Sequence, residues 1–144
     1  MSPSTKSFFH QATFTWTHLV WDPATGQAVV IDPVLDYVPA SGQTATESAA
    51  EVVEFTEENS LSIKYALETH AHADHITAAA WFKSQTGCEV GIGKGICGVQ
   101  ETFLKVYNLG ADLVPDGSQF DLLLSDGDCL PLGELEIRVM ATPG

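Results

Sequence analysis

Basic residues are scarce in this sequence of 144 residues. Six lysines and arginines stand against 19 aspartates and glutamates, which gives a formal net charge of -13 at pH 7. A protein that binds a nucleic-acid backbone neutralises several phosphates with lysine and arginine, and an anionic membrane surface attracts the same residue types. We therefore expect neither nucleic acid nor a membrane among the partners of this protein.

Long apolar runs are also missing. No stretch approaches the ~18 consecutive apolar residues of a membrane-spanning helix. The segment Met1–Gln11 is polar apart from Phe8 and Phe9, so it lacks the apolar core of a signal peptide. We expect neither a membrane span nor a signal peptide.

Cysteine is rare, and its three positions, Cys88, Cys97 and Cys129, lie far apart. Their odd number and wide spacing fit neither a disulfide framework nor a Cys-x-x-Cys zinc site. A reducing compartment, the cytoplasm, is the predicted location. We interpret the three side chains as buried or inert thiols.

The sequence nevertheless holds enough apolar residues to fold. Hydrophobic residues make up 44% of the chain and charged residues 17%, a balance that excludes global disorder. A chain near this length buries roughly 68–70% of the surface that its unfolded form exposes. Because no internal repeat or linker interrupts the pattern, we expect one folding unit.

Alternating residues predict a β-hairpin near the start of the chain. Polar and apolar residues alternate over 13–20, and β-branched residues dominate 27–34. The intervening Asp-Pro-Ala-Thr-Gly segment, 22–26, is typical of a turn. A loop is expected over 37–43.

The rest of the chain alternates between predicted helices and strands. A capping box from Ser48 to Glu51 opens the first helix, and Gly87 is a suitable left-handed end for the second. The expected elements are a helix over 46–59, a strand over 63–67, a helix over 74–86, a strand over 90–92, a helix over 97–109, and strands over 120–124 and 135–139. This order indicates an α/β fold with a mixed sheet and flanking helices, in which ligands bind where strands end and loops begin.

One segment, His70-x-His72-x-Asp74-His75, carries a strong chemical signal at the end of such a strand. In an extended loop residues i and i+2 point to the same side, so His70 and His72 can face one ion. Asp74 and His75 are expected to enter the next helix, where they would serve a second ion or a water molecule and where helix amides would stabilise the charge of Asp74. These ligand types suit zinc or ferrous iron. The alternative is a solvated loop, but three of the five histidines fall within these six positions.

The segment resembles the His-x-His-x-Asp-His signature of the metallo-β-lactamase superfamily. Four further matches accompany it: Ile31-Asp32-Pro33-Val34, the run Glu68–Thr77, the turn Asp126-Gly127-Asp128, and Thr142-Pro143-Gly144. Together they are similar to the branch that contains the persulfide dioxygenases and glyoxalase II.

This resemblance implies a metallo-β-lactamase αββα sandwich built from two similar halves, with the metals in the cleft between the sheets. Residues 1–144 resemble the N-terminal half of this single domain. In the family a third metal-binding histidine follows the Thr-Pro-Gly motif, and an aspartate and another histidine come later. We therefore expect the remaining ligands in a C-terminal half that is absent from this sequence.

The resemblance also implies roles for individual residues. His70 and His72 would bind a first metal, and Asp74 with His75 a second. In dioxygenase members a single iron is held by the histidine that matches His70 together with two ligands from the other half, while the remaining three residues orient water or the ligand. Asp74 is the predicted catalytic residue, and Asp32 is expected to orient the metal-binding loop by a hydrogen bond from below.

The function that the resemblance implies is a non-haem Fe(II) persulfide dioxygenase that oxidises glutathione persulfide, a glutathione-linked small molecule, to sulfite. A glyoxalase II-like thioester hydrolase with two zinc ions is the alternative, and β-lactam hydrolysis is a weaker third. A non-catalytic half-domain is a different alternative. It would associate with a second copy, or with the missing half, through an exposed apolar face.

Three other features receive a structural interpretation. His18 lies on an alternating strand, where a hydrogen-bonded structural histidine is more common than a ligand. His10 is expected to be solvated. The Gly91-x-Gly93-x-Gly95 segment lacks a complete phosphate-binding fingerprint and is interpreted as a strand-to-helix turn.

Overall fold

The computed structural model describes residues 2–110 and 114–143, so Gly144 of the Thr-Pro-Gly motif lies outside the described residues. In chain order the elements are β1 (Ser4–His10), β2 (Thr15–Trp21), β3 (Gln27–Ile31), β4 (Val34–Val38), β5 (Gln43–Ala45), α1 (Glu47–Glu58), β6 (Ser62–Glu68), β7 (Ile76–Thr77), α2 (Ala79–Thr86), β8 (Glu89–Gly93), α3 (Ile96–Tyr107), β9 (Leu122–Leu124), β10 (Cys129–Leu132) and β11 (Leu135–Arg138).

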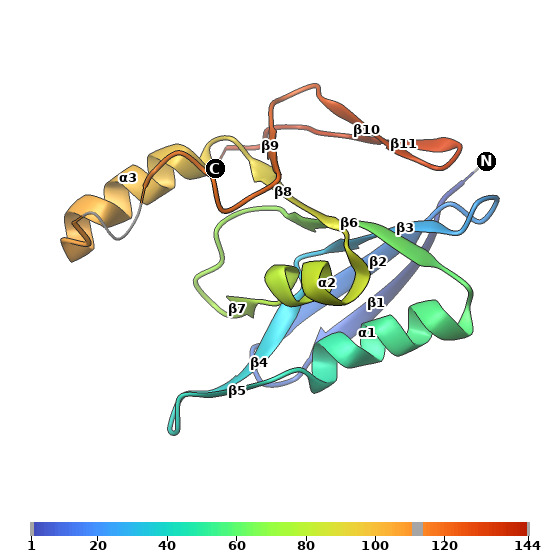
Figure 1. Cartoon of the computed structure of the whole chain (residues 1–144), viewed down its shortest axis with the longest axis horizontal. Helices are drawn as coiled ribbons and strands as arrows, with labels where there is room; N and C mark the ends of the chain where they lie inside the picture. The colour runs from blue at the N-terminus through green and yellow to red at the C-terminus, as the bar shows by residue number, and fades with distance from the viewer. Residues whose placement is uncertain (1, 111–113, 144) are drawn as a thin grey trace.

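A six-stranded mixed sheet with the order β1-β2-β3-β6-β8-β9 forms the centre of the molecule (Figure 1). The pairs β1–β2 and β2–β3 are antiparallel, whereas β3, β6, β8 and β9 run parallel to one another. Parallel strands end at the same edge of a sheet, so the loops that follow β3 and β6 lie next to each other. The predicted α/β class with flanking helices is confirmed.

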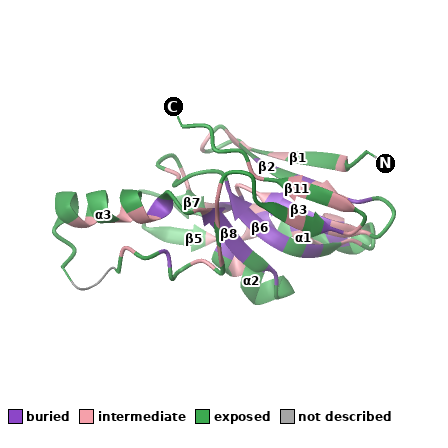
Figure 2. Ribbon diagram, turned by 90° about the horizontal axis from the view of Figure 1, so that it is seen from above, coloured by how far each residue is buried: buried purple, intermediate pink, exposed green. Residues whose placement is uncertain are grey.

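Alternate residues of β3 pack into two separate hydrophobic cores. Ala28 and Val30 pack with residues of α1 and α2, while Val29 packs with Tyr65 and Leu132 under the β10–β11 hairpin. Figure 2 shows the buried residues concentrated in the central strands, while α3 extends away from them. Helices α1 and α2 contribute to one of the two cores and the β10–β11 hairpin to the other. Because both faces are covered, β3 has the continuous apolar sequence of a buried strand.

Five strands lie outside the sequence-based prediction: β1, β4, β5, β7 and β10. Of these, β4 and β5 take up the two ends of the segment 37–43 that was expected as a loop. β1 is an edge strand that pairs with β2 over its whole length, but most of its side chains are exposed and its sequence is largely polar. β10 is short and contains Pro131, which is typical of an edge. Strands held mainly by backbone hydrogen bonds leave a weak hydrophobic pattern, which explains why β1 and β10 were missed.

Helix α1 begins close to its predicted start but not with the predicted cap. Thr46 is the N-cap residue, and it makes no side-chain capping bond. Instead the carboxylate of Asp36 on β4 accepts the backbone amide of Ser48 at 2.9 Å and its hydroxyl at 2.6 Å. Burial opposes the charge, but these bonds hold the pKa of Asp36 below its ordinary value. His10 also contacts Asp36, with 3.1 Å between Nε2 and Oδ1, so its expected solvation is wrong.

Helix α2 is shorter than predicted. It covers Ala79–Thr86 and ends, as expected, at a left-handed Gly87 with φ of 73°. Asp74 and His75 are not helical, because the β-branched pair Ile76–Thr77 forms β7 and pairs with the exposed edge of β4. None of the described helices is long and apolar enough to cross a membrane.

Phe82 offers a test of the helix-side core, since its side chain is fully buried between α2 and the sheet. Phe82→Ala should lower the free energy of unfolding by about 3–5 kcal/mol, the usual cost of a cavity of that size. Phe14→Ala is the matched control, because that ring is 72% exposed, and it should change the value by less than ~0.5 kcal/mol. Urea denaturation measures both, and equal losses would contradict this assignment of the core.

Candidate metal centre

The segment Glu68–Thr77, called the metal loop below, leaves β6 at the edge where β3 also ends. The residue after β3 is Asp32, whose amide continues the ladder by donating to the carbonyl of Leu67 at 2.9 Å. Asp32 has a left-handed backbone with φ of 51°, a conformation that aspartate tolerates better than most residues. The chain therefore turns at Asp32 immediately beside the start of the metal loop.

The carboxylate of Asp32 receives three hydrogen bonds from the metal loop. Thr69 donates its amide to Oδ1 and its hydroxyl to Oδ2, both at 2.7 Å. Nε2 of His72 lies 3.0 Å from Oδ1. The structure thus places Asp32 beneath the loop, in contact with one predicted ligand directly and beside another.

Glu68 is a member of the site that the sequence interpretation missed. Its side chain is only 3% exposed, and its Oε2 lies 3.0 Å from Nε2 of His72 while Oε1 accepts the hydroxyl of Thr77. Burial, reinforced by the charge of Asp32, raises the pKa of Glu68 against the opposing hydrogen bonds. A glutamate at the end of a buried strand needs a hydrogen-bond or charge partner. Its position after the apolar run of β6 is the sequence feature that could have identified Glu68.

These carboxylates determine the protonation of the His72 ring. Nε2 of His72 lies 3.0 Å from both Asp32 and Glu68, so it carries the proton and donates. In the neutral ring the lone pair then belongs to Nδ1. Nδ1 lies 3.8 Å from Oδ1 of Asp74, on the side that faces the other predicted ligands.

His75 is buried without satisfying its polar atoms. Its side chain is 2% exposed, and among the described residues neither ring nitrogen has a hydrogen-bond partner. Oδ1 of Asp74 approaches Nδ1 only to 3.4 Å. Burial and then the nearby His72 hold the pKa of His75 below its ordinary value, which keeps the ring neutral. A neutral imidazole with an unused lone pair is a suitable metal ligand, so the residues present fit a metal ion.

The structure brings all four predicted ligands together around His72. The ring centroids of His70 and His75 lie 4.3 and 4.1 Å from that of His72. Two overlapping groups could hold an ion, one of Asp32, His70 and His72 and one of His72, Asp74 and His75, and within each group the ligand atoms lie within 4.8 Å of one another.

Asp74 is the exposed member of the group, with 51% of its side chain accessible. A hydrogen bond from its own amide, followed by the nearby His75, holds its pKa below the ordinary value. The expected stabilisation by helix amides is wrong, because α2 starts only at Ala79. Asp74 is therefore ionised and accessible in the non-helical part of the loop.

A cleft of about 270 Å³ lies beside the metal loop. Imidazoles and Thr77 form one part of its lining, and apolar side chains form another. The apolar part consists of Ile76, Ile92, Ile96 and Phe120. The cleft therefore presents a small molecule with a polar wall of candidate ligands and an apolar wall from β8, α3 and their neighbours.

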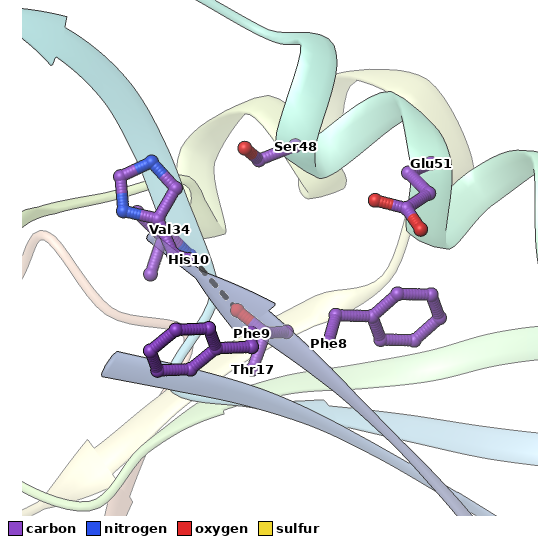
Figure 3. A pocket seen from close by; sticks show the side chains of 7 residues that line it. All are labelled: Phe8, Phe9, His10, Thr17, Val34, Ser48 and Glu51. Atoms are coloured by element: carbon purple, nitrogen blue, oxygen red, sulfur yellow. Dashed lines mark hydrogen bonds between the residues drawn. The ribbon is translucent and has the colours of Figure 1, made fainter. Parts of the chain in front are cut away.

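A second hollow, between β1, β2, β4 and α1, has a different character. Figure 3 shows His10, Ser48 and Glu51 around it, with the amide of Val34 donating to Thr17 at 3.2 Å. Its volume is about 20 Å³, which is room for one water molecule. It is too small for an organic substrate.

The other singled-out side chains lie away from the metal loop. His18 bonds to Ser7 through Nδ1 at 2.8 Å, in agreement with a structural role. Cys88 is buried, and burial raises its pKa, as expected for an inert thiol. Cys129 is exposed, against expectation, but the nearby Glu136 raises its pKa, so it carries little reactive thiolate.

Thr77 provides a test of the connection between the loop and α2. Its hydroxyl donates to Glu68 and accepts the amide of Ala79 at 3.0 Å. Thr77→Val leaves both partners unsatisfied and should lower the free energy of unfolding by about 1–3 kcal/mol. Thr77→Ser keeps the hydroxyl and should lose less than half as much in urea denaturation. A loss in Thr77→Ser as large as that in Thr77→Val would contradict a dominant role of the hydroxyl, and a larger loss would assign the stabilisation to the methyl group.

Known proteins are similar to nearly the whole of this chain. The sequence model of the metallo-beta-lactamase superfamily matches residues 11–144. A curated relative from Burkholderia pseudomallei, named "Probable metallo-hydrolase", is 45% identical over 96% of this chain and 47% of its own length. The mitochondrial persulfide dioxygenase of Homo sapiens is 29% identical over 96% of this chain and 43% of its own length.

A solved structure is similar over the same region. The crystal structure of ETHE1 from Myxococcus xanthus matches with a TM-score of 0.70 and 28% identity, over 98% of this chain and 49% of that one. The chain thus spans about half the length of these relatives. The matched half contains the six-stranded sheet and the complete metal loop.

Proposed function

This chain belongs to the metallo-beta-lactamase superfamily, and from that membership we propose that its metal loop binds a catalytic metal ion in a non-haem iron persulfide dioxygenase. The metal assignment depends above all on His75, a buried imidazole whose two nitrogens lack partners among the described residues. The dioxygenase assignment is supported by the similarity to the human persulfide dioxygenase over 96% of this chain.

In this proposal His70 is the iron ligand that the chain contributes. The two other ligands would lie in the part of the relatives that this chain does not span. When bound, iron supplies open coordination positions for sulfur and for O₂. Overall, one glutathione persulfide, one O₂ and one water give one glutathione and one sulfite with release of two protons.

The chain's own residues would orient the ligand and handle protons. His72 is fixed by Asp32 and Glu68. Asp74 is exposed, and its low pKa keeps the carboxylate ionised at neutral pH, so it can accept a proton from the persulfide or from water. The apolar side chains that line the cleft, Ile76, Ile92, Ile96 and Phe120, offer a surface for the apolar part of a substrate.

A second candidate function is a two-metal thioester hydrolase of the glyoxalase II type. Two observations favour it: the clustering of His70, His72, Asp74 and His75, enough side chains for two ions, and the higher identity, 45%, to the relative named as a metallo-hydrolase. Two zinc ions would lower the pKa of a bound water for attack on the thioester carbonyl.

Metal analysis and two activity assays on the purified protein distinguish these functions. A dioxygenase should contain one iron per chain and consume one O₂ per sulfite formed from glutathione persulfide. Two zinc ions per chain with hydrolysis of lactoylglutathione, and no oxygen uptake, would overturn the dioxygenase proposal in favour of the hydrolase.

Asp74→Asn should lower kcat about 10²- to 10⁴-fold in the dioxygenase assay, because it removes the proton acceptor. His18→Ala is the control, since His18 contacts Ser7 rather than the metal loop, and it should retain activity. An unchanged kcat in Asp74→Asn would remove Asp74 from the catalytic role.

A further inference from the structure

We propose that Thr69 is a positioning residue that selects which nitrogen of His70 is free to bind metal. Thr69 contacts Asp32 on one side and His70 on the other: its Oγ1 lies 2.7 Å from Oδ2 of Asp32 and 2.8 Å from Nδ1 of His70. The consequence for metal binding rests on the proposed function, whereas the hydrogen-bond relay itself does not.

The direction of each hydrogen bond follows from counting protons. Asp32 receives the amide of Thr69 and Nε2 of His72 on Oδ1, so its carboxylate acts as an acceptor. The hydroxyl of Thr69 has a single proton, and it donates that proton to Oδ2. Oγ1 is then left as an acceptor, so the bond to His70 requires a proton on Nδ1 of that ring.

One carboxylate thereby sets the protonation of two rings in opposite senses. His72 donates directly from Nε2, which leaves Nδ1 with the lone pair. His70 donates from Nδ1 through Thr69, which leaves Nε2 with the lone pair. A neutral imidazole has only one lone pair for a metal, so this inversion determines which atom each histidine offers.

Threonine suits this position better than serine or valine. Its branched Cβ restricts rotation of the hydroxyl, and the 2.7 Å bond from its amide to Asp32 fixes the backbone at the same point. Valine has the same shape but no hydroxyl. Thr69→Val therefore removes the relay while keeping the volume and the backbone bond, and Thr69→Ser restores the relay with a looser side chain.

Nitrogen-15 NMR of histidine-labelled, metal-free protein at a pH where the rings are neutral tests the relay. The signals are assigned by their loss in His70→Ala and His72→Ala. In the wild type, His70 should carry its proton on Nδ1 and His72 on Nε2. Thr69→Val should shift His70 toward the Nε2-protonated form and leave His72 unchanged, and Thr69→Ser should recover the wild-type pattern.

Thr77→Val is the matched control, because it makes the same substitution in the same loop without a contact to His70. Its His70 signals should match the wild type. The relay is overturned if His70 of the wild type is protonated on Nε2, or if Thr69→Val leaves the proton on Nδ1.

Zinc titration monitored by calorimetry tests the consequence for metal binding. Thr69→Val should raise the Kd for zinc about 10- to 100-fold, the usual cost of losing a hydrogen bond to a metal-binding histidine. Thr69→Ser should recover most of the affinity. An unchanged Kd in Thr69→Val would overturn the role in metal binding. If the wild type binds no metal but shows the expected ring protonation, the relay stands and the proposed metal-dependent function fails.

Discussion

The carboxylate of Asp32 is the contact on which the metal loop depends. It accepts both polar hydrogens of Thr69 and the Nε2 proton of His72, and no other described residue joins the end of β3 to the loop so closely. The left-handed backbone at Asp32, with φ of 51°, costs on the order of 1–2 kcal/mol. Three bonds to a charged acceptor, each worth roughly 1.5–3 kcal/mol, more than offset that cost. The left-handed conformation is the one in which the carboxylate reaches the loop.

The electrostatics of the loop favour a bound cation. Asp32 and Glu68 share one N–H of His72, and Asp74 adds a third carboxylate nearby, while burial keeps His75 neutral. Burial, together with the nearby charge of Asp32, raises the pKa of Glu68. A divalent ion among the imidazoles would relieve both the surplus negative charge and the unpartnered nitrogens of His75.

Much of this arrangement was readable in the sequence, and the failures at α2, Glu68 and His10 share a physical cause. The hairpin of β2 and β3, helices α1 and α3 and the clustering of the four candidate ligands follow from local patterns that the structure reproduces. The start of α2 does not follow from a local pattern, because Ile76–Thr77 pairs with β4 as a strand instead of forming the first turn of the helix. Glu68 and His10 were missed for the same reason: their partners, at Thr77 and Asp36, are brought near by tertiary structure.

The placement of the two carboxylates decides how firmly the ligands are held. Asp32 directly follows β3 and Glu68 ends β6, and these are adjacent parallel strands buried between two cores. Side chains supported by packed strands hold a site more accurately than side chains on loops. The histidines themselves lie on a loop. Hydrogen bonds to Asp32 and Glu68, made directly by His72 and through Thr69 by His70, fix their orientation relative to the strands. The candidate ligands are thus already oriented, so an ion that binds there would meet a fixed set of lone pairs.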